Sequence, residues 1–380
     1  MIIDHPNSPS GRVPLGAALM CGALWLGATA QADVGAAKTI ASGLANPRGL
    51  DFAPNGDLYV AESGSGGTGN CTFSPPNPTV NRCYGETGAV SRVRPEGGFE
   101  RVVTGLPSLG LPDGTAEGGP VDVSFLGTAG YVMMSWGGNP GLRAGLGPKS
   151  WMFGTLVHVT PGGTYRAVAD VAAHEVAYNP AGGNVDSNPY DVVALPGRRL
   201  VADAGANAII EVLPNGRSTT FSLIPPLPPV PPIPAPREPV PTAIVEGPDG
   251  ALYVSLLTGF PFWPGTSPVL RIPSDGGAPQ TYASGFTAVV DLAFDHGGAL
   301  YVLEVARGQV GPFPPPPPNP GLGIGRLLRQ CPGAAPTVLL ENLTFPGGVA
   351  IGPDGAAYLT NFGTSSTLGE VLRLPLSPCS

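Results

Sequence analysis

One pattern of apolar segments and turns recurs six times along this chain. Its first copy, PRGLDFAPNGDLYVAES at residues 47–63, has two apolar segments around a PNG turn and predicts a β-hairpin. A third apolar segment follows each hairpin, as in GEVLRLPLSP, and a fourth often ends in Gly-Leu or a close relative, as in ERVVTGL. The hairpins start at Pro47, Pro120, Pro189, Pro241, Val289 and Pro346.

Four short strands per repeat, separated by turn residues, are the layout of a β-propeller blade. We therefore predict an all-β fold, a six-bladed β-propeller over residues 33–380. The last repeat ends after its third strand, and residues 37–44 supply a spare strand of the fourth type. We expect this N-terminal strand to pair with the last blade and close the ring. A parallel α/β fold would need helical spacers, and Pro and Gly interrupt every candidate helix.

The N-terminal segment, residues 1–32, is predicted to be a secretory signal peptide. Arg12 precedes an apolar run over residues 13–26, and residues 30–32 supply a small-x-small cleavage site. The run is too short for a membrane anchor, and the residue before Cys21 is not the small one that lipidation requires. We expect an exported protein, periplasmic or extracellular, with no membrane span in the mature chain.

Composition and charge exclude some partners. The net charge is −8, and removal of the signal leaves it unchanged, which argues against nucleic acid and anionic membranes. Charged residues are only 12% of the chain, and its 57 Gly and 48 Pro fall between the apolar segments, where turns need them. Two Pro-rich inserts, residues 224–241 and 311–320, are predicted to be polyproline II spacers, with docking of a partner protein as the alternative.

Four cysteines remain after the predicted cleavage, an even number that favours two disulfides in an exported chain. The chain has no CxxC motif and little His, which disfavours metal binding by these cysteines. Closeness in sequence suggests Cys71 with Cys83, which leaves Cys331 with Cys379. Four cysteines allow three pairings, and the sequence leaves all three open.

Oxygen-bearing side chains recur at equivalent positions of the repeats and are candidates for a central site. One set, three residues beyond the second-strand aromatic position, offers the oxygen ligands that a hard cation such as calcium requires. Its other interpretation is structural, as acceptors for backbone amides of the following turn. This first set is Glu62, Asp203, Glu304 and Asn361. A second set, two positions after the opening residue of the innermost strand, adds acidic groups to the channel and comprises Asp122, Asp191 and Asp291.

A separate candidate is the loop LLTGFPFWPG, residues 256–265. Phe260, Phe262 and Trp263 in this proline-stiffened loop are candidates for an aromatic platform that binds a planar or apolar ligand. Packing of the same side chains against their own blade is an equally good interpretation. Nucleophilic catalysis has little support, because no His lies near a Ser or Cys motif such as GxSxG.

Several segments resemble the ScyD/ScyE family of exported propeller proteins. They are GFPFWPG after an LYV strand, LVADAGANAIIEV, NPYDV, LYVLEVARG and AAYLTNFGTSSTLGEVLRL. The resemblance covers nearly all of the mature chain and implies an exported propeller. The repeats also resemble NHL propellers and gluconolactonase-type enzymes. The chain departs from the ScyD/ScyE pattern at Ser255, where such proteins often carry Glu.

Two functional classes follow, and they leave open whether the chain is an enzyme. The first is a binding or scaffold propeller whose partner is an unknown small molecule or protein. The alternative is a metal-assisted hydrolase of gluconolactonase type, in which a channel cation polarises a carbonyl and Glu304 manages protons. The resemblance to such enzymes implies one divalent cation, and the chain offers Glu62, Asp203, Glu304 and Asn361 as its ligands.

Overall fold

The computed structural model describes residues 35–94, 96–160, 162–230, 235–259, 262–307 and 322–379. The predicted signal peptide and the insert at 311–320 lie outside these residues, as does part of the insert at 224–241. Within the described chain, β-strands predominate, joined by turns, two short 3-10 helices and one α-helix.

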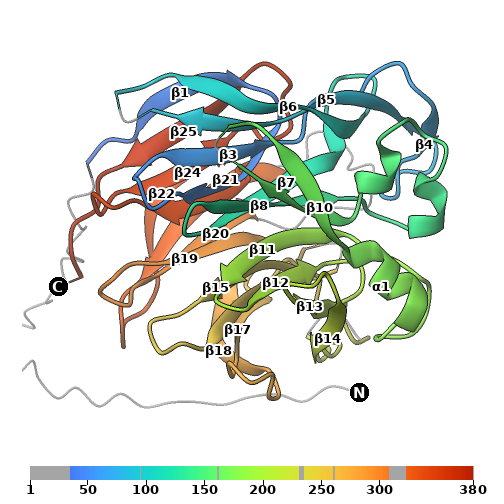
Figure 1. Cartoon of the computed structure of the whole chain (residues 1–380). Helices are drawn as coiled ribbons and strands as arrows, with labels where there is room; N and C mark the ends of the chain where they lie inside the picture. Colours follow the sequence, from blue (N-terminus) through green and yellow to red (C-terminus); the bar gives the residue numbers. More distant parts are fainter. Residues whose placement is uncertain are drawn as a thin grey trace, which may run out of the picture. The chain divides into compact units, whose positions relative to one another are not determined.

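The described strands form five antiparallel sheets (Figure 1). The largest has nine strands and joins two meanders edge to edge, because β6 of the first meander also pairs with β7 of the second. Its strands are β2 (Pro47–Phe52), β3 (Leu58–Glu62), β4 (Cys71–Phe73), β5 (Asn81–Val93), β6 (Phe99–Gly110), β7 (Ala116–Leu126), β8 (Ala129–Ser135), β9 (Thr155–Val159) and β10 (Tyr165–Asp170).

Three four-stranded meanders follow in chain order. The first contains β11 (Pro189–Leu195), β12 (Arg198–Asp203), β13 (Ala208–Val212) and β14 (Ser218–Leu223). The second contains β15 (Pro241–Glu246), β16 (Leu252–Leu256), β17 (Ser267–Ile272) and β18 (Gln280–Phe286). The third contains β19 (Val289–Phe294), β20 (Leu300–Ala306), β21 (Leu322–Gln330) and β22 (Thr337–Thr344).

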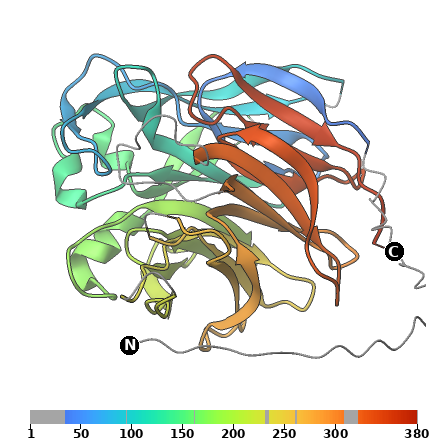
Figure 2. The ribbon, with the colours of Figure 1, turned by 180° about the vertical axis from the view of Figure 1, so that it is seen from behind.

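The last sheet is built from both ends of the described chain. β23 (Gly348–Ile351), β24 (Ala357–Asn361) and β25 (Gly369–Leu374) are completed by β1 (Lys38–Leu44), which pairs antiparallel with β25. Figure 2 shows this arrangement from behind, with the blue N-terminal strand beside the red C-terminal strands. The predicted closure by an N-terminal strand is confirmed.

The innermost strands of successive meanders form a closed ring. β2 contacts β7, and the contacts continue in chain order through β11, β15, β19 and β23, which contacts β2 again. This ring of antiparallel meanders makes the fold an all-β propeller, as the repeat predicts.

The hydrophobic core lies between neighbouring sheets. Val121 and Met133 of one meander pack with Val201 and Ile210 of the next, and similar clusters fill the other junctions. Side chains alternate between the two faces of a strand, so each sheet presents an apolar face to each of its neighbours. This explains why the strands are apolar almost throughout.

Two disulfides join the cysteine pairs that closeness in sequence suggests. Cys71–Cys83 connects β4 to β5, and Cys331–Cys379 ties the C-terminal tail to the turn after β21. Arg329 Nη1 fastens the same tail by donating to the Ser377 carbonyl. Structural disulfides are characteristic of proteins from oxidising compartments.

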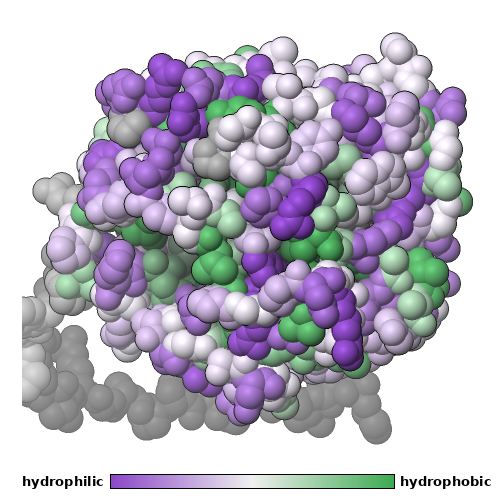
Figure 3. All heavy atoms as spheres, viewed as in Figure 1, coloured by the Kyte–Doolittle hydropathy of each residue, from purple (hydrophilic) through white to green (hydrophobic). Residues whose placement is uncertain are grey.

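The surface mixes polar and apolar residues. On the face seen in Figure 3, hydrophobic residues form small patches among hydrophilic ones. Among the described residues, no helix has the length and apolar character needed to cross a membrane.

Candidate functional site

A cavity of about 380 Å³ lies along the ring of innermost strands, and we call it the channel cavity. Each described innermost strand, β2, β7, β11, β15, β19 and β23, contributes lining residues. Its aspartates include the predicted second set and also Asp51, which the sequence reasoning missed because Gly49 holds the equivalent position in the first repeat. A Cβ atom at Gly49 would overlap Asp122 Oδ1, so the neighbouring carboxylate occupies that space.

Each aspartate of the channel cavity is bonded to the next innermost strand. The carboxylate oxygen accepts a hydrogen bond from a backbone N–H across the junction between two meanders. The pairs are Asp51 Oδ2 with Phe125 N (2.8 Å), Asp122 Oδ2 with Val192 N (3.0 Å), Asp191 Oδ2 with Ile244 N (3.3 Å) and Asp291 Oδ2 with Val349 N (2.6 Å). These side chains therefore join neighbouring blades.

The pKa values of the four channel aspartates are raised above the ordinary value for Asp. Burial raises the pKa of Asp51 to about 6 and that of Asp291 to about 7, against the opposing effect of the backbone N–H groups. Burial, reinforced by repulsion from neighbouring carboxylates, raises the pKa of Asp122 and Asp191 well above the usual range. The cavity thus holds carboxyl groups that repel one another when ionised.

The four residues of the predicted calcium set lie outside the channel cavity, three of them as the last residue of the second strand of their meander and Glu304 two residues before the end of β20. Each accepts a hydrogen bond from the backbone N–H of a residue that precedes the innermost strand of its own meander. The bonds are Glu62 with Ala45 N (2.6 Å), Asp203 with Asn188 N (2.7 Å), Glu304 with Thr287 N (2.8 Å) and Asn361 with Thr344 N (2.7 Å).

Two members of this set also form ion pairs. Arg101 Nη2 donates to Glu62 (2.7 Å), and Arg326 Nε donates to Glu304 (2.6 Å). Among the described residues, no three or more His, Cys, Asp or Glu side chains are grouped to hold a metal ion. The structural interpretation accounts for the bonds that are present, and the calcium site stays a prediction.

The predicted aromatic platform is described only in part. Phe262 packs against Ala288 and Ala306, and the Trp263 carbonyl accepts a hydrogen bond from the Thr266 hydroxyl (2.8 Å). Phe260 lies outside the described residues. A platform for an apolar ligand stays a prediction.

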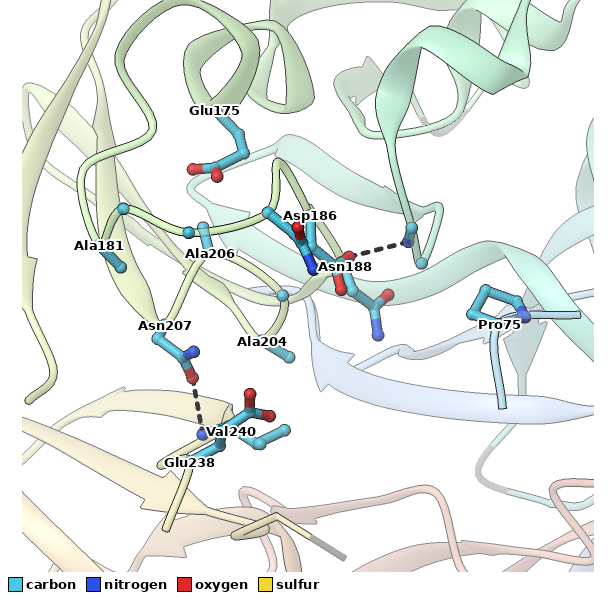
Figure 4. Close-up of a pocket in the computed structure, with 16 residues that line it drawn as sticks. Pro75, Glu175, Ala181, Asp186, Asn188, Ala204, Ala206, Asn207, Glu238 and Val240 are labelled. Atoms are coloured by element: carbon cyan, nitrogen blue, oxygen red, sulfur yellow. Dashed lines mark hydrogen bonds between the residues drawn. The ribbon is translucent and has the colours of Figure 1, made fainter. Parts of the chain in front are cut away.

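A second cavity, of about 410 Å³, opens near the start of β11 and the end of β12, and we call it the mouth pocket (Figure 4). It is lined by parts of the segment 181–188, the turn 204–207 and the segment before β15. Its polar side chains are Glu175, Asn184, Asp186, Asn188, Asn207 and Glu238.

Hydrogen bonds fix the walls of the mouth pocket. Asp203 Oδ1 accepts hydrogen bonds from the backbone N–H groups of Asn188 (2.7 Å), Gly205 (3.1 Å) and Ala206 (3.1 Å). Asp203, a member of the predicted calcium set, therefore holds the backbone of three residues that line the pocket. Two further bonds appear as dashed lines in Figure 4: Asn207 Oδ1 accepts from Val240 N (3.0 Å), and Asp186 Oδ1 accepts from Gly138 N (3.0 Å).

Glu175 reaches the mouth pocket from α1 (Val171–Tyr178), the helix between β10 and β11. Asp170 caps this helix by accepting from Ala173 N (3.0 Å), and it also pairs with Arg143. Glu175 is 2% exposed, and its Oε2 atom has no hydrogen-bond partner. Burial, followed by repulsion from Asp203, raises the pKa of Glu175 to about 7, against the opposing effect of the Asp186 backbone N–H.

Sequence reasoning missed Glu175 because it lies in a helical insertion outside the strand repeat. The only available signal was the run AGGNVDSN at residues 181–188, which concentrates amide and acidic side chains before a predicted strand. Binding residues lie disproportionately on loops, so such a run indicates a loop that lines a binding site.

No protein-family model matches the chain, and the comparison with curated proteins finds no match. Similar solved structures include a Bacteroides thetaiotaomicron protein of unknown function (10% identity, 89% of this chain and 76% of that one, TM-score 0.52). Others are a glucose dehydrogenase (14%, 90% and 100%, 0.51) and the soluble aldose sugar dehydrogenase of Escherichia coli (12%, 90% and 99%, 0.50). At these identities the likeness shows a shared β-propeller fold. The ScyD/ScyE resemblance remains a prediction.

Proposed function

We propose that this chain is an exported, ScyD/ScyE-like propeller of six blades that binds a small molecule in the mouth pocket. The count of six follows if the nine-stranded sheet is taken as two blades. Two disulfides support an oxidising compartment.

One observation carries the choice of site. The mouth pocket is a cavity of about 410 Å³ whose wall includes a buried carboxylate with an unpaired oxygen, Glu175. Buried polar atoms are normally paired, so an unpaired one beside a cavity indicates an incomplete set of interactions that a ligand completes. The aspartates of the channel cavity, in contrast, are bonded to backbone N–H groups.

Metal-assisted hydrolysis is the less favoured function. It needs convergent ligands that hold a cation where it polarises a carbonyl. The described part of the chain contains no such group of His, Cys, Asp or Glu, and Glu304 is bonded to Arg326.

The test blocks the mouth pocket with a bulky side chain. Ala181 lines the pocket and is exposed, so Ala181→Trp adds a ring to the cavity without disturbing the core. Leu368→Trp, at a residue 63% exposed in the turn before β25, is the matched control. Thermal unfolding is followed with a panel of sugars, diamines, amino acids and aromatic acids.

We expect at least one compound class to raise the melting temperature of the wild type and of Leu368→Trp, but not that of Ala181→Trp. Equal shifts in all three proteins, or no shift in the wild type with any class, would contradict the proposal.

A further inference from the structure

Acidic and amide side chains dominate the polar lining of the mouth pocket. Glu175, Asp186 and Glu238 carry carboxylates, and no Lys or Arg is among the described residues that line the cavity. One of these acids, Asp186, interacts electrostatically with the guanidinium of Arg82. Arg82 itself donates to the carbonyls of Trp136 (2.7 Å) and Gly137 (2.6 Å); Gly137 lines the pocket, but Arg82 does not.

Glu175 lacks a counter-charge. No ion pair with an Arg, Lys or His of the described chain is formed, and Oε2 is unpaired. A carboxylate that is 2% exposed costs free energy when ionised unless a cation or hydrogen-bond donors compensate it. The carboxylates of Asp203 and Asp186 repel its negative charge, and the backbone N–H of Asp186 compensates only part of this cost, since the pKa of Glu175 stays raised. A positively charged ligand would supply the counter-charge that Glu175 lacks.

The spacing of the acids indicates what kind of cation fits. The described residues contain no trio of carboxylates close enough to share a metal ion. Glu175 projects from α1 and Glu238 from the segment before β15, which form opposite walls of the pocket in Figure 4. Positive charges separated along a chain match this arrangement better than one compact ion. The exposed Asn184 and the half-buried Asn188 offer further hydrogen-bond groups along the same cavity.

We propose that the mouth pocket binds a short linear diamine or polyamine, with one ammonium group at Glu175 and a second at Glu238. This inference rests on the proposed function, because it names the ligand class of the same pocket. Asp186 adds negative potential to the pocket lining, and its Oδ1 accepts a hydrogen bond from Gly138 N.

The test measures binding of putrescine and spermidine by isothermal titration calorimetry at low ionic strength, with 1,4-butanediol as the neutral, length-matched control. Both amines should bind and the diol should not. Glu175→Gln and Glu238→Gln should each weaken the affinity for putrescine about tenfold, because each removes one charged contact. Glu246→Gln changes an exposed acid of the channel cavity and should leave the affinity unchanged.

A second readout separates a contact from a purely structural role. When putrescine binds near pH 7, the ammonium group at Glu175 should drive release of a proton from this carboxyl group. The measured enthalpy should then depend on the ionisation enthalpy of the buffer in the wild type, and not in Glu175→Gln. Thermal unfolding of each variant confirms that it is folded.

Three results overturn the inference. They are absence of amine binding at millimolar concentration, binding that Ala181→Trp leaves intact, and equal affinity of the wild type and both Gln variants. If a neutral ligand stabilises the wild type but not Ala181→Trp while no amine binds, the proposed function stands and only the diamine assignment fails. If no compound responds to Ala181→Trp, both fail.

Discussion

The channel cavity and the mouth pocket both contain buried or half-buried acids, but these acids are bonded differently. In the channel cavity each aspartate accepts a hydrogen bond from a backbone N–H of the next blade. In the mouth pocket Glu175 keeps an oxygen without a partner. The comparison teaches that acid content does not distinguish a binding site from a structural joint. What distinguishes them is whether an oxygen atom of the acid is left without a hydrogen-bond partner inside the protein.

The largest expected effect on stability comes from removing a channel aspartate that is hydrogen-bonded to the next blade. Asp291 accepts from Leu292 N (2.7 Å) and Val349 N (2.6 Å), so Asp291→Ala leaves two backbone N–H groups without their acceptor. We expect the free energy of unfolding to fall by about 3 kcal/mol at pH 5, measured by urea denaturation. The control Glu246→Ala, in the same cavity but exposed, should change it by less than about 0.5 kcal/mol. Equal losses in both variants would show that Asp291 does not join the blades.

The second effect is on pH dependence. The folded pKa values of Asp51 and Asp291, about 6 and about 7, are raised above their ordinary value of 3.8, so the folded state binds these protons more tightly than the unfolded chain. Their contribution to stability is full at low pH and is lost as the pH rises through 6 to 7. We expect the free energy of unfolding to fall on the order of 2 kcal/mol from pH 5 to pH 8.

A difference measurement isolates this contribution. His158 and His174 act in the opposite direction, because burial lowers the pKa of each imidazole and favours its neutral form. Asp291→Asn keeps a side-chain oxygen acceptor but cannot ionise. The loss of stability between pH 5 and pH 8 should therefore be smaller in Asp291→Asn than in the wild type, and identical slopes would exclude Asp291 as a source.

The smallest effect has the opposite sign and comes from the mouth pocket. The pKa of Glu175 is raised from 4.5 to about 7, so its ionised form opposes folding above that pH. Glu175→Gln keeps a carbonyl acceptor and removes the charge. We expect no change in stability at pH 5 and a gain of about 1 kcal/mol at pH 8, measured by denaturation at both values. A loss of stability at pH 8 would mean that Glu175 is held by internal bonds after all.

The propeller could be predicted from the sequence because the same pattern of strands and turns occurs six times. Each copy makes the interpretation of the others more secure. Closure by residues 37–44 was predictable for the same reason, since the last repeat lacks a strand that the N-terminus supplies. The site was harder. Asp122, Asp191 and Asp291 do line the channel cavity, but Asp51 escaped the positional rule.

Glu175 escaped prediction for a physical reason. Whether an acid is satisfied depends on which backbone N–H groups face it, and that is decided by contacts between segments distant in sequence. Nothing in the residues around Glu304 distinguishes its bonds to Thr287 and Arg326 from the unpaired oxygen of Glu175. Periodicity identifies the strands on which acids lie, but not the donors that reach them.

The first described strand pairs with the last described strand. β1 finds its partner in β25, and the hydrogen bond from Thr39 to Glu370 joins side chains 331 residues apart. A product that stops short of β25 therefore keeps an exposed strand edge at its N-terminus, which invites aggregation and proteolysis. Ring closure therefore requires that β25 has been synthesised, and until then the edge of β1 stays unpaired.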